Sequence, residues 1–213
     1  MARRKKATRA KRSAPRRASR RPTKKLDARE MLFNTERFLA GPSLDIGGAV
    51  KYVATIAIIP ALVGLIATFI GLEGRLIPLP LMQVPLLLGI TGLQAAIAAF
   101  VLTIIGAVLS LLVWGTVLHI ACKLVGGLRP LNDTMTAAAA SMTPMLLLGW
   151  IPFIQIIAAV QSLAVLVFGL NRKQTLTIFE ASLAVALPII LIALVGIFLL
   201  VSIPAFIPLQ FFA

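Results

Sequence analysis

The sequence predicts an all-α polytopic membrane protein: a five-helix transmembrane bundle with a disordered basic N-terminal tail and a short interfacial amphipathic helix. Two observations predict this class. Hydrophobic residues make up 59% of the 213 residues and the mean hydropathy is +0.98, above the roughly 45–50% apolar share of soluble domains. The first 25 residues also hold thirteen of the 21 Lys and Arg residues and no acidic residue. We therefore divide the chain into a tail (1–25), an amphipathic segment (26–42) and a membrane domain (43–213).

The tail is predicted to be disordered and cytoplasmic. It lacks the apolar residues that would offset chain entropy, and its like charges repel one another. It is too long and too basic for the n-region of a secretory signal, and no cleavage-site pattern follows it. Its basic residues form the candidate polyanion-binding site: Arg3, Arg4, Lys5, Lys6, Arg9, Lys11, Arg12, Arg16, Arg17, Arg20, Arg21, Lys24 and Lys25.

The amphipathic segment follows the tail. Asp27 with Glu30 three residues later forms a capping-box pattern, apolar residues then recur at helical spacing, and Gly41-Pro42 ends the pattern. Arg29 and Arg37 lie on its polar face. We interpret this segment as a helix lying on the membrane surface, with a short soluble linker helix as the alternative.

The first span is predicted at residues 49–70, which are apolar over a length that crosses about 30 Å of hydrocarbon. Ser43 is the expected cap of this helix, and Pro60 is expected to kink it. Three prolines between Leu76 and Gly92 argue against a continuous helix there. That stretch is therefore a re-entrant segment, an interfacial segment or a loop.

Four further spans follow. Residues 95–122 carry no charge and form span two. The uncharged stretch 134–170 would be about 55 Å long as one helix, too long for a single crossing. It must turn back, and Gly149-Trp150-Ile151-Pro152 is the expected turn, with Trp150 at a membrane interface. The remaining spans are therefore 134–149, 152–170 and 181–203.

The distribution of basic residues orients the five spans. With five crossings, sixteen Lys and Arg residues through Lys51 and two in each of two later loops share one side, against Arg75 alone on the other. A sixth span at 76–92 would move the later loops across and place five basic residues outside. The positive-inside bias therefore favours a multi-pass protein of the cell membrane with a cytoplasmic N-terminus and the C-terminus outside.

The membrane domain offers little catalytic chemistry. Ser110, Ser141 or Ser162 with His119 formally supplies a nucleophile and a base, but no orienting group accompanies them. Cys122 is the only cysteine and is expected to be a small apolar filler. We therefore predict no enzyme, no cofactor and no metal site.

Packing between helices is predicted to rest on small residues, which let helix backbones approach closely. No charged residue lies in mid-span, and interhelical hydrogen bonds explain the amide side chains of Gln94, Gln155 and Gln161. Broken helices at proline keep a small transporter or channel as the alternative function, with a pathway lined by Gln155, Gln161 or backbone freed at Pro60, Pro144 and Pro188. The small-residue ridge of span two is Ala95, Ala99, Thr103 and Ala107.

The positive charge of the tail exceeds what anchoring and orientation require, because its densest part lies more than about 15–20 residues from the first span. Its expected partners are anionic lipid headgroups or ribosomal RNA, since such Arg-rich arms resemble ribosomal-protein extensions that bind a phosphate backbone. No aromatic residue interleaves the tail, so any nucleic-acid binding should be indifferent to sequence. Small-residue helix faces are the expected surfaces for protein partners or a homo-oligomer, and no small-molecule substrate is evident.

The landmarks from Val113 to Pro188 resemble the Yip domain, a family of multi-span proteins named for interaction with Ypt/Rab GTPases. The landmarks are Trp114, His119, Lys123–Gly127, Leu131–Thr134, Ser141–Pro144, Trp150–Pro152, Phe168–Leu170 and Ala181–Pro188. The resemblance implies five helices, a cytoplasmic N-terminus and a non-enzymatic role as a membrane scaffold or adaptor. It also implies structural roles for Gly126, Gly127, Pro144, Pro152, Gly169 and Pro188. Gly41-Pro42 is only a fragment of the family's Asp-Leu-Tyr-Gly-Pro segment, so GTPase binding is not carried over.

Overall fold

The computed structural model describes residues 35–70 and 89–206, with side chains over 38–70 and 89–198. The tail, the first part of the predicted amphipathic helix (26–34), most of the Leu76–Gly92 stretch and residues 207–213 lie outside the described residues. No strand occurs within the described ranges. Their helices are α2 (Thr35–Ala40), α3 (Ile46–Phe69), α5 (Gly92–Leu124), α6 (Leu131–Leu148), α7 (Ile154–Gln174) and α8 (Ile178–Phe206).

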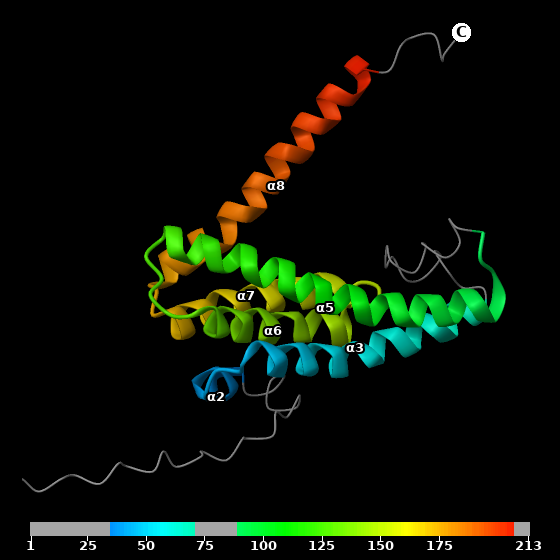
Figure 1. The fold of residues 1–213 in the computed structure, drawn as a ribbon, viewed down its shortest axis with the longest axis horizontal. Helices are drawn as coiled ribbons and strands as arrows, with labels where there is room; N and C mark the ends of the chain where they lie inside the picture. Colours follow the sequence, from blue (N-terminus) through cyan, green and yellow to red (C-terminus); the bar gives the residue numbers. More distant parts are fainter. Residues whose placement is uncertain (1–34, 71–88, 207–213) are drawn as a thin grey trace, which may run out of the picture.

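Each predicted span corresponds to one long helix, and the helices extend two to four residues beyond most predicted ends. Pro60 lies inside α3 and Pro144 inside α6. The expected turn is confirmed, because α6 ends at Leu148 and α7 begins at Ile154. Figure 1 shows α3, α5, α6 and α7 side by side, and consecutive helices among these four run in opposite directions.

Helix α6 is the centre of the bundle and contacts α3, α5 and α7. Its middle turns are built from Ala137, Ala138, Ala139 and Ala140, which are all buried. Small side chains allow three neighbouring helices to approach one backbone closely. Gly169 of α7 shows how close the approach is, because a Cβ added there would lie 3.0 Å from the Cβ of Ala137.

Four of the described helices are long and apolar enough to cross a membrane: α3, α5, α7 and α8, the last over Ile178–Phe198. Helix α6 is not among them, since its first two turns carry Asn132, Asp133, Thr134 and Thr136. The predicted count of five membrane-spanning helices is therefore not confirmed, whereas a multi-pass helical membrane protein is supported.

Helix α2 is the described part of the predicted amphipathic segment, and its six residues are too few to confirm an amphipathic helix from 26 to 42. It contacts α7. Phe38 packs on Tyr52 of α3 with ring centroids 5.8 Å apart, and Leu39 is buried. These contacts fix the segment that precedes α3 against the bundle.

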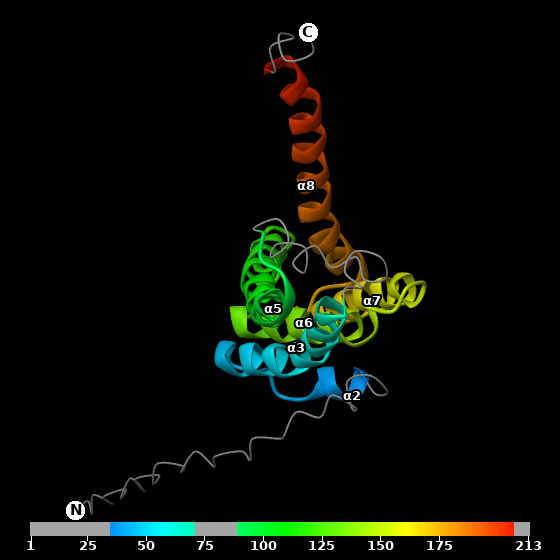
Figure 2. The same ribbon diagram turned by 90° about the vertical axis from the view of Figure 1, so that its right-hand side faces the viewer.

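Helix α8 leaves the bundle. Its first turns pack on α5 and α7 through buried Ala181, Ala184, Val185 and Pro188. From Ile189 to Phe198 every residue is exposed, and the helix extends away from the other helices in two perpendicular views (Figures 1 and 2). No other described part of the chain covers this part of α8.

The small-residue ridge of α5 is confirmed as a packing surface. Ala95, Ala99 and Ala107 are buried, and Thr103 donates a hydrogen bond to the carbonyl of Ala99 in its own helix at 2.7 Å. Cys122 is fully buried in the same core, as expected of an apolar filler.

Candidate functional site

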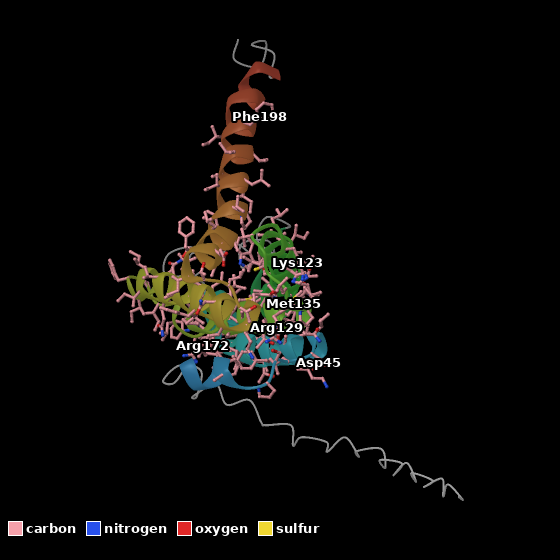
Figure 3. All side chains as sticks on the ribbon, turned by 90° about the vertical axis from the view of Figure 1, so that its left-hand side faces the viewer. Asp45, Lys123, Arg129, Met135, Arg172 and Phe198 are labelled. Atoms are coloured by element: carbon pink, nitrogen blue, oxygen red, sulfur yellow. The ribbon has the colours of Figure 1, made fainter. Side chains whose placement is uncertain are left out.

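The described polar side chains that join different helices gather mainly at one end of the bundle, where α2, the start of α3, the end of α5, the start of α6 and the end of α7 meet. We call it the basic end, because Lys123, Arg129, Arg172 and Lys173 lie there. Figure 3 looks onto this end and labels Lys123, Arg129 and Arg172. Sequence reasoning placed these cations on one side of the membrane but did not identify the contacts between them and the helices.

Gln174 is the centre of the first cluster at the basic end. It is the last residue of α7, it is fully buried, and Thr175 with φ of 57° turns the chain away immediately after it. Its Oε1 accepts from the backbone N–H of Arg129 at 3.2 Å, while its Nε2 donates to Thr134 Oγ1 at 2.7 Å and to the carbonyl of Pro130 at 3.3 Å. One side chain therefore fixes the loop between α5 and α6 from the neighbouring helix.

The same cluster includes His119, whose Nδ1 is hydrogen-bonded with Thr134 Oγ1 at 2.9 Å. His119 therefore joins α5 to α6. Among the described contacts its partner is a threonine and none of the three serines considered as nucleophiles; Ser141 donates to the carbonyl of Ala138 at 2.8 Å. The arrangement is that of a helix joint.

A second cluster holds the segment between α2 and α3. Lys173 Nζ donates to the carbonyl of Gly41 at 2.7 Å and to Ser43 Oγ at 3.2 Å, and Ser43 in turn donates to the carboxylate of Asp133. Lys173 is 7% exposed and Asp133 9%. The Ser43 hydroxyl therefore bridges the ammonium of Lys173 and the carboxylate of Asp133, which are both largely buried. Burial of either charge without a partner would be costly.

Ser43 has a different role from the predicted helix cap. Asp45 caps α3, because its side chain accepts from the backbone N–H of Gly48 at 3.1 Å. Ser43 is two residues too early to do so and binds α6 instead. The backbone N–H of Leu44 also donates to Thr136 Oγ1 at 2.8 Å. The entry into α3 is thus attached to α6 at two successive residues.

The predicted motif glycines shape the loop that Gln174 fixes. Gly126 has φ of 101°, a conformation that side-chain-bearing residues rarely adopt. The N–H of Gly127 donates to the carbonyl of Cys122 at 2.7 Å, and a Cβ on Gly127 would lie 2.9 Å from that oxygen and 3.1 Å from Gln174 Oε1. Both positions require glycine for reasons visible in the geometry.

The other predicted motif residues lie in α6, α7, α8 and the turn between α6 and α7. Pro144 is buried in α6, Pro188 is buried in α8, and Gly169 packs on Ala137. Pro152 lies in the turn between α6 and α7, and its carbonyl accepts from the N–H of Ile154 at 2.9 Å. None of these four takes part in the polar clusters described above.

The rest of the described bundle carries little polar chemistry. The side chains of Gln94, Gln155 and Gln161 make no hydrogen bond among the described residues, and the amide side chain that joins helices is that of Gln174. A hollow of about 480 Å³ is lined by Leu109, Ser110, Val113 and Trp114 of α5, and it includes none of the prolines or glutamines of the predicted pathway. No group of three or more His, Cys, Asp or Glu side chains that would suit a metal ion occurs in the described part of the chain.

Comparison with known proteins identifies no relative of this chain. No protein-family model matches the chain, and no curated protein or solved structure matches it significantly. The Yip-domain resemblance therefore stays a prediction from the sequence.

Proposed function

We propose that the protein is a non-enzymatic membrane scaffold or adaptor of Yip-like type, whose cytoplasmic basic tail recruits a polyanion, either anionic lipid or ribosomal RNA. The observation that carries the proposal is the separation of polar from apolar structure. Buried alanines fill the middle of the bundle, whereas the charged and hydrogen-bonding clusters lie at the end to which α2 is attached. Such a molecule offers one polar surface on an apolar platform.

The tail joins the platform at this end. Lys25 precedes Thr35, the first residue of α2, by ten residues, a separation of at most about 36 Å of extended chain. Lys173 and Ser43 hold the segment that follows α2, so the attachment point is fixed relative to the helices. In this proposal the tail recruits its ligand near the basic end.

The proposed topology has five crossings, with the basic end in the cytoplasm and the C-terminus outside the cell membrane. The alternating directions of α3, α5, α6 and α7 support the first four crossings, and the position of Lys123, Arg129 and Arg172 at the end to which α2 is attached supports the cytoplasmic location of that end. In this topology α6 crosses the membrane between α3, α5 and α7. Contacts with these helices keep the polar side chains of its first turns away from lipid.

Deletion of residues 1–25 tests the recruitment. The full chain should co-sediment with ribosomes or RNA, or bind anionic vesicles through the basic residues of its tail. The truncated chain should lose this binding. Affinity for RNA should fall with salt, with a log–log slope of about −0.7 per phosphate neutralised. A scrambled tail of identical composition is the matched control and should retain binding, since no aromatic residue is available for base stacking. Unchanged binding after deletion would refute tail-mediated recruitment.

Comparing the two ligands identifies the partner. Ribosomal RNA is the ligand if two results are obtained. RNA should displace the full chain from anionic vesicles, and ribosomes should co-sediment with the full chain at physiological salt. If only anionic vesicles respond to the tail, the ligand is lipid. The transporter alternative gains nothing from the hollow on α5, whose lining is apolar apart from Ser110.

A further inference from the structure

The last two residues of α5 and the loop that follows them, residues 123–130, carry exposed side chains that take no part in the polar clusters. Leu124 is 77% exposed and Leu128 84%, among the highest exposures of any described aliphatic side chain. Lys123 and Arg129 flank them and are also exposed. Two exposed leucines and two exposed cations thus belong to one short segment, and Figure 3 shows its two cations, Lys123 and Arg129, at the basic end.

Hydrogen bonds hold the loop backbone on both sides. Its α5 side is closed by the hydrogen bond from Gly127 to the carbonyl of Cys122, and Gly126 supplies the left-handed backbone that the closure requires. Its α6 side is held by Gln174, which contacts the backbone of Arg129 and of Pro130. A preformed loop loses little conformational entropy on binding a ligand.

The two cations are not neutralised within the described part of the chain. The carboxylates described there are otherwise engaged: Asp133 with Ser43, Asp45 with the N–H of Gly48, and Glu180 with the N–H of Thr177. The side chains of Lys123 and Arg129 make no hydrogen bond or ion pair with described residues. Both therefore remain available to an external anion.

We propose that this loop is a binding site for the headgroup phosphate of an anionic phospholipid, independent of the tail. Lys123 and Arg129 contact the phosphate, while Leu124 and Leu128 enter the boundary of the acyl chains. The position suits this ligand, because α5 is an apolar membrane helix whose last turn contains Lys123, so the loop lies at the level of the headgroups. The exposed leucines distinguish a lipid from a soluble phosphate, which would make no use of them.

The test compares variants of the full chain in detergent, titrated with phosphatidylglycerol and followed by native mass spectrometry of bound lipid. Lys123→Gln/Arg129→Gln should weaken binding by about five-fold per charge, or roughly 25-fold together. The control is Lys51→Gln, which removes one exposed charge that lies outside both the loop and the tail and should leave this binding within about two-fold of wild type. If Lys51→Gln weakens binding as much as Lys123→Gln or Arg129→Gln alone, lipid follows net charge, and the loop site would be refuted.

A second pair of measurements separates lipid from free phosphate and folding from binding. Leu124→Ser/Leu128→Ser should reduce phosphatidylglycerol binding several-fold, and excess glycerol phosphate should not displace the lipid from the wild-type chain. Displacement by glycerol phosphate, or full lipid binding by the serine variant, would refute the lipid assignment. Protection of the buried Cys122 thiol from maleimide confirms that each variant is folded, and a result from such a variant bears on binding alone.

Discussion

The substitution Gly127→Ala should destabilise the protein through one added methyl group. Its Cβ would lie 2.9 Å from the carbonyl oxygen of Cys122 and 3.1 Å from Gln174 Oε1. The first atom belongs to the backbone of α5 and the second to a fully buried side chain with three hydrogen bonds, so neither yields easily. We expect about 1–3 kcal/mol from overpacking and about 1 kcal/mol from the weakened contact between Gln174 and Arg129, a total of about 2–4 kcal/mol.

Gly115→Ala is the matched control for this prediction. Its Cβ would meet the Sδ of Met135, an even closer approach, but the sulfur belongs to a flexible side chain that has other rotamers. Relief by Met135, together with a helix-propensity gain of about 0.5–1 kcal/mol, should keep this variant close to wild type. Thermal unfolding in detergent measures both, and for Gly127→Ala a fall in Tm of roughly 4–16 °C is expected. If Gly115→Ala lowers Tm as much as Gly127→Ala, the reasoning from rigid and flexible neighbours is wrong.

Three further outcomes follow from the contacts. Lys173→Met should cost about 1.5–3 kcal/mol, because it removes the charged hydrogen bonds to Gly41 and Ser43; exposed Lys51→Met should leave Tm nearly unchanged, and equal shifts would contradict the assignment. Tyr52→Phe should cost about 0.5–1.5 kcal/mol through loss of the 2.9 Å hydrogen bond with Thr143, more than Thr116→Val on the exposed face of α5, as unfolding in detergent would show. Cys122, the only cysteine, should react with maleimide in denaturing detergent but not in the folded protein; rapid labelling of the folded protein would place it outside the core.

The sequence predicted the elements far better than the joints between them. Length alone required a turn inside residues 134–170, and the turn lies where Gly149 and Pro152 indicated. Apolar length likewise located α3, α5, α7 and α8. The contacts at the basic end were not predictable in this way, because Lys173 and Gly41 are 132 residues apart and no periodicity records their meeting.

Gln174 shows the same limit in a single residue. Interhelical hydrogen bonds were predicted for Gln155 and Gln161, because both amides lie in the apolar part of α7. The amide that forms such bonds lies instead at the end of that helix, next to two cations that made it resemble a loop residue. The hydrogen bonds of Gln174 form only because Gly126 and Gly127 let the loop approach it, and this approach is a property of the tertiary structure.

The contrast between α6 and α8 explains why hydropathy finds one and passes over the other. A helix surrounded by lipid must be apolar on every side, and from Ile189 to Phe198 α8 is exposed on every side and wholly apolar. Helix α6 touches three other helices, so Thr134, Thr136 and Thr143 find partners in Gln174, Leu44 and Tyr52. Hydropathy therefore reports contact with lipid, and the helix that the protein itself encloses is free to carry the hydroxyl groups that join the bundle together.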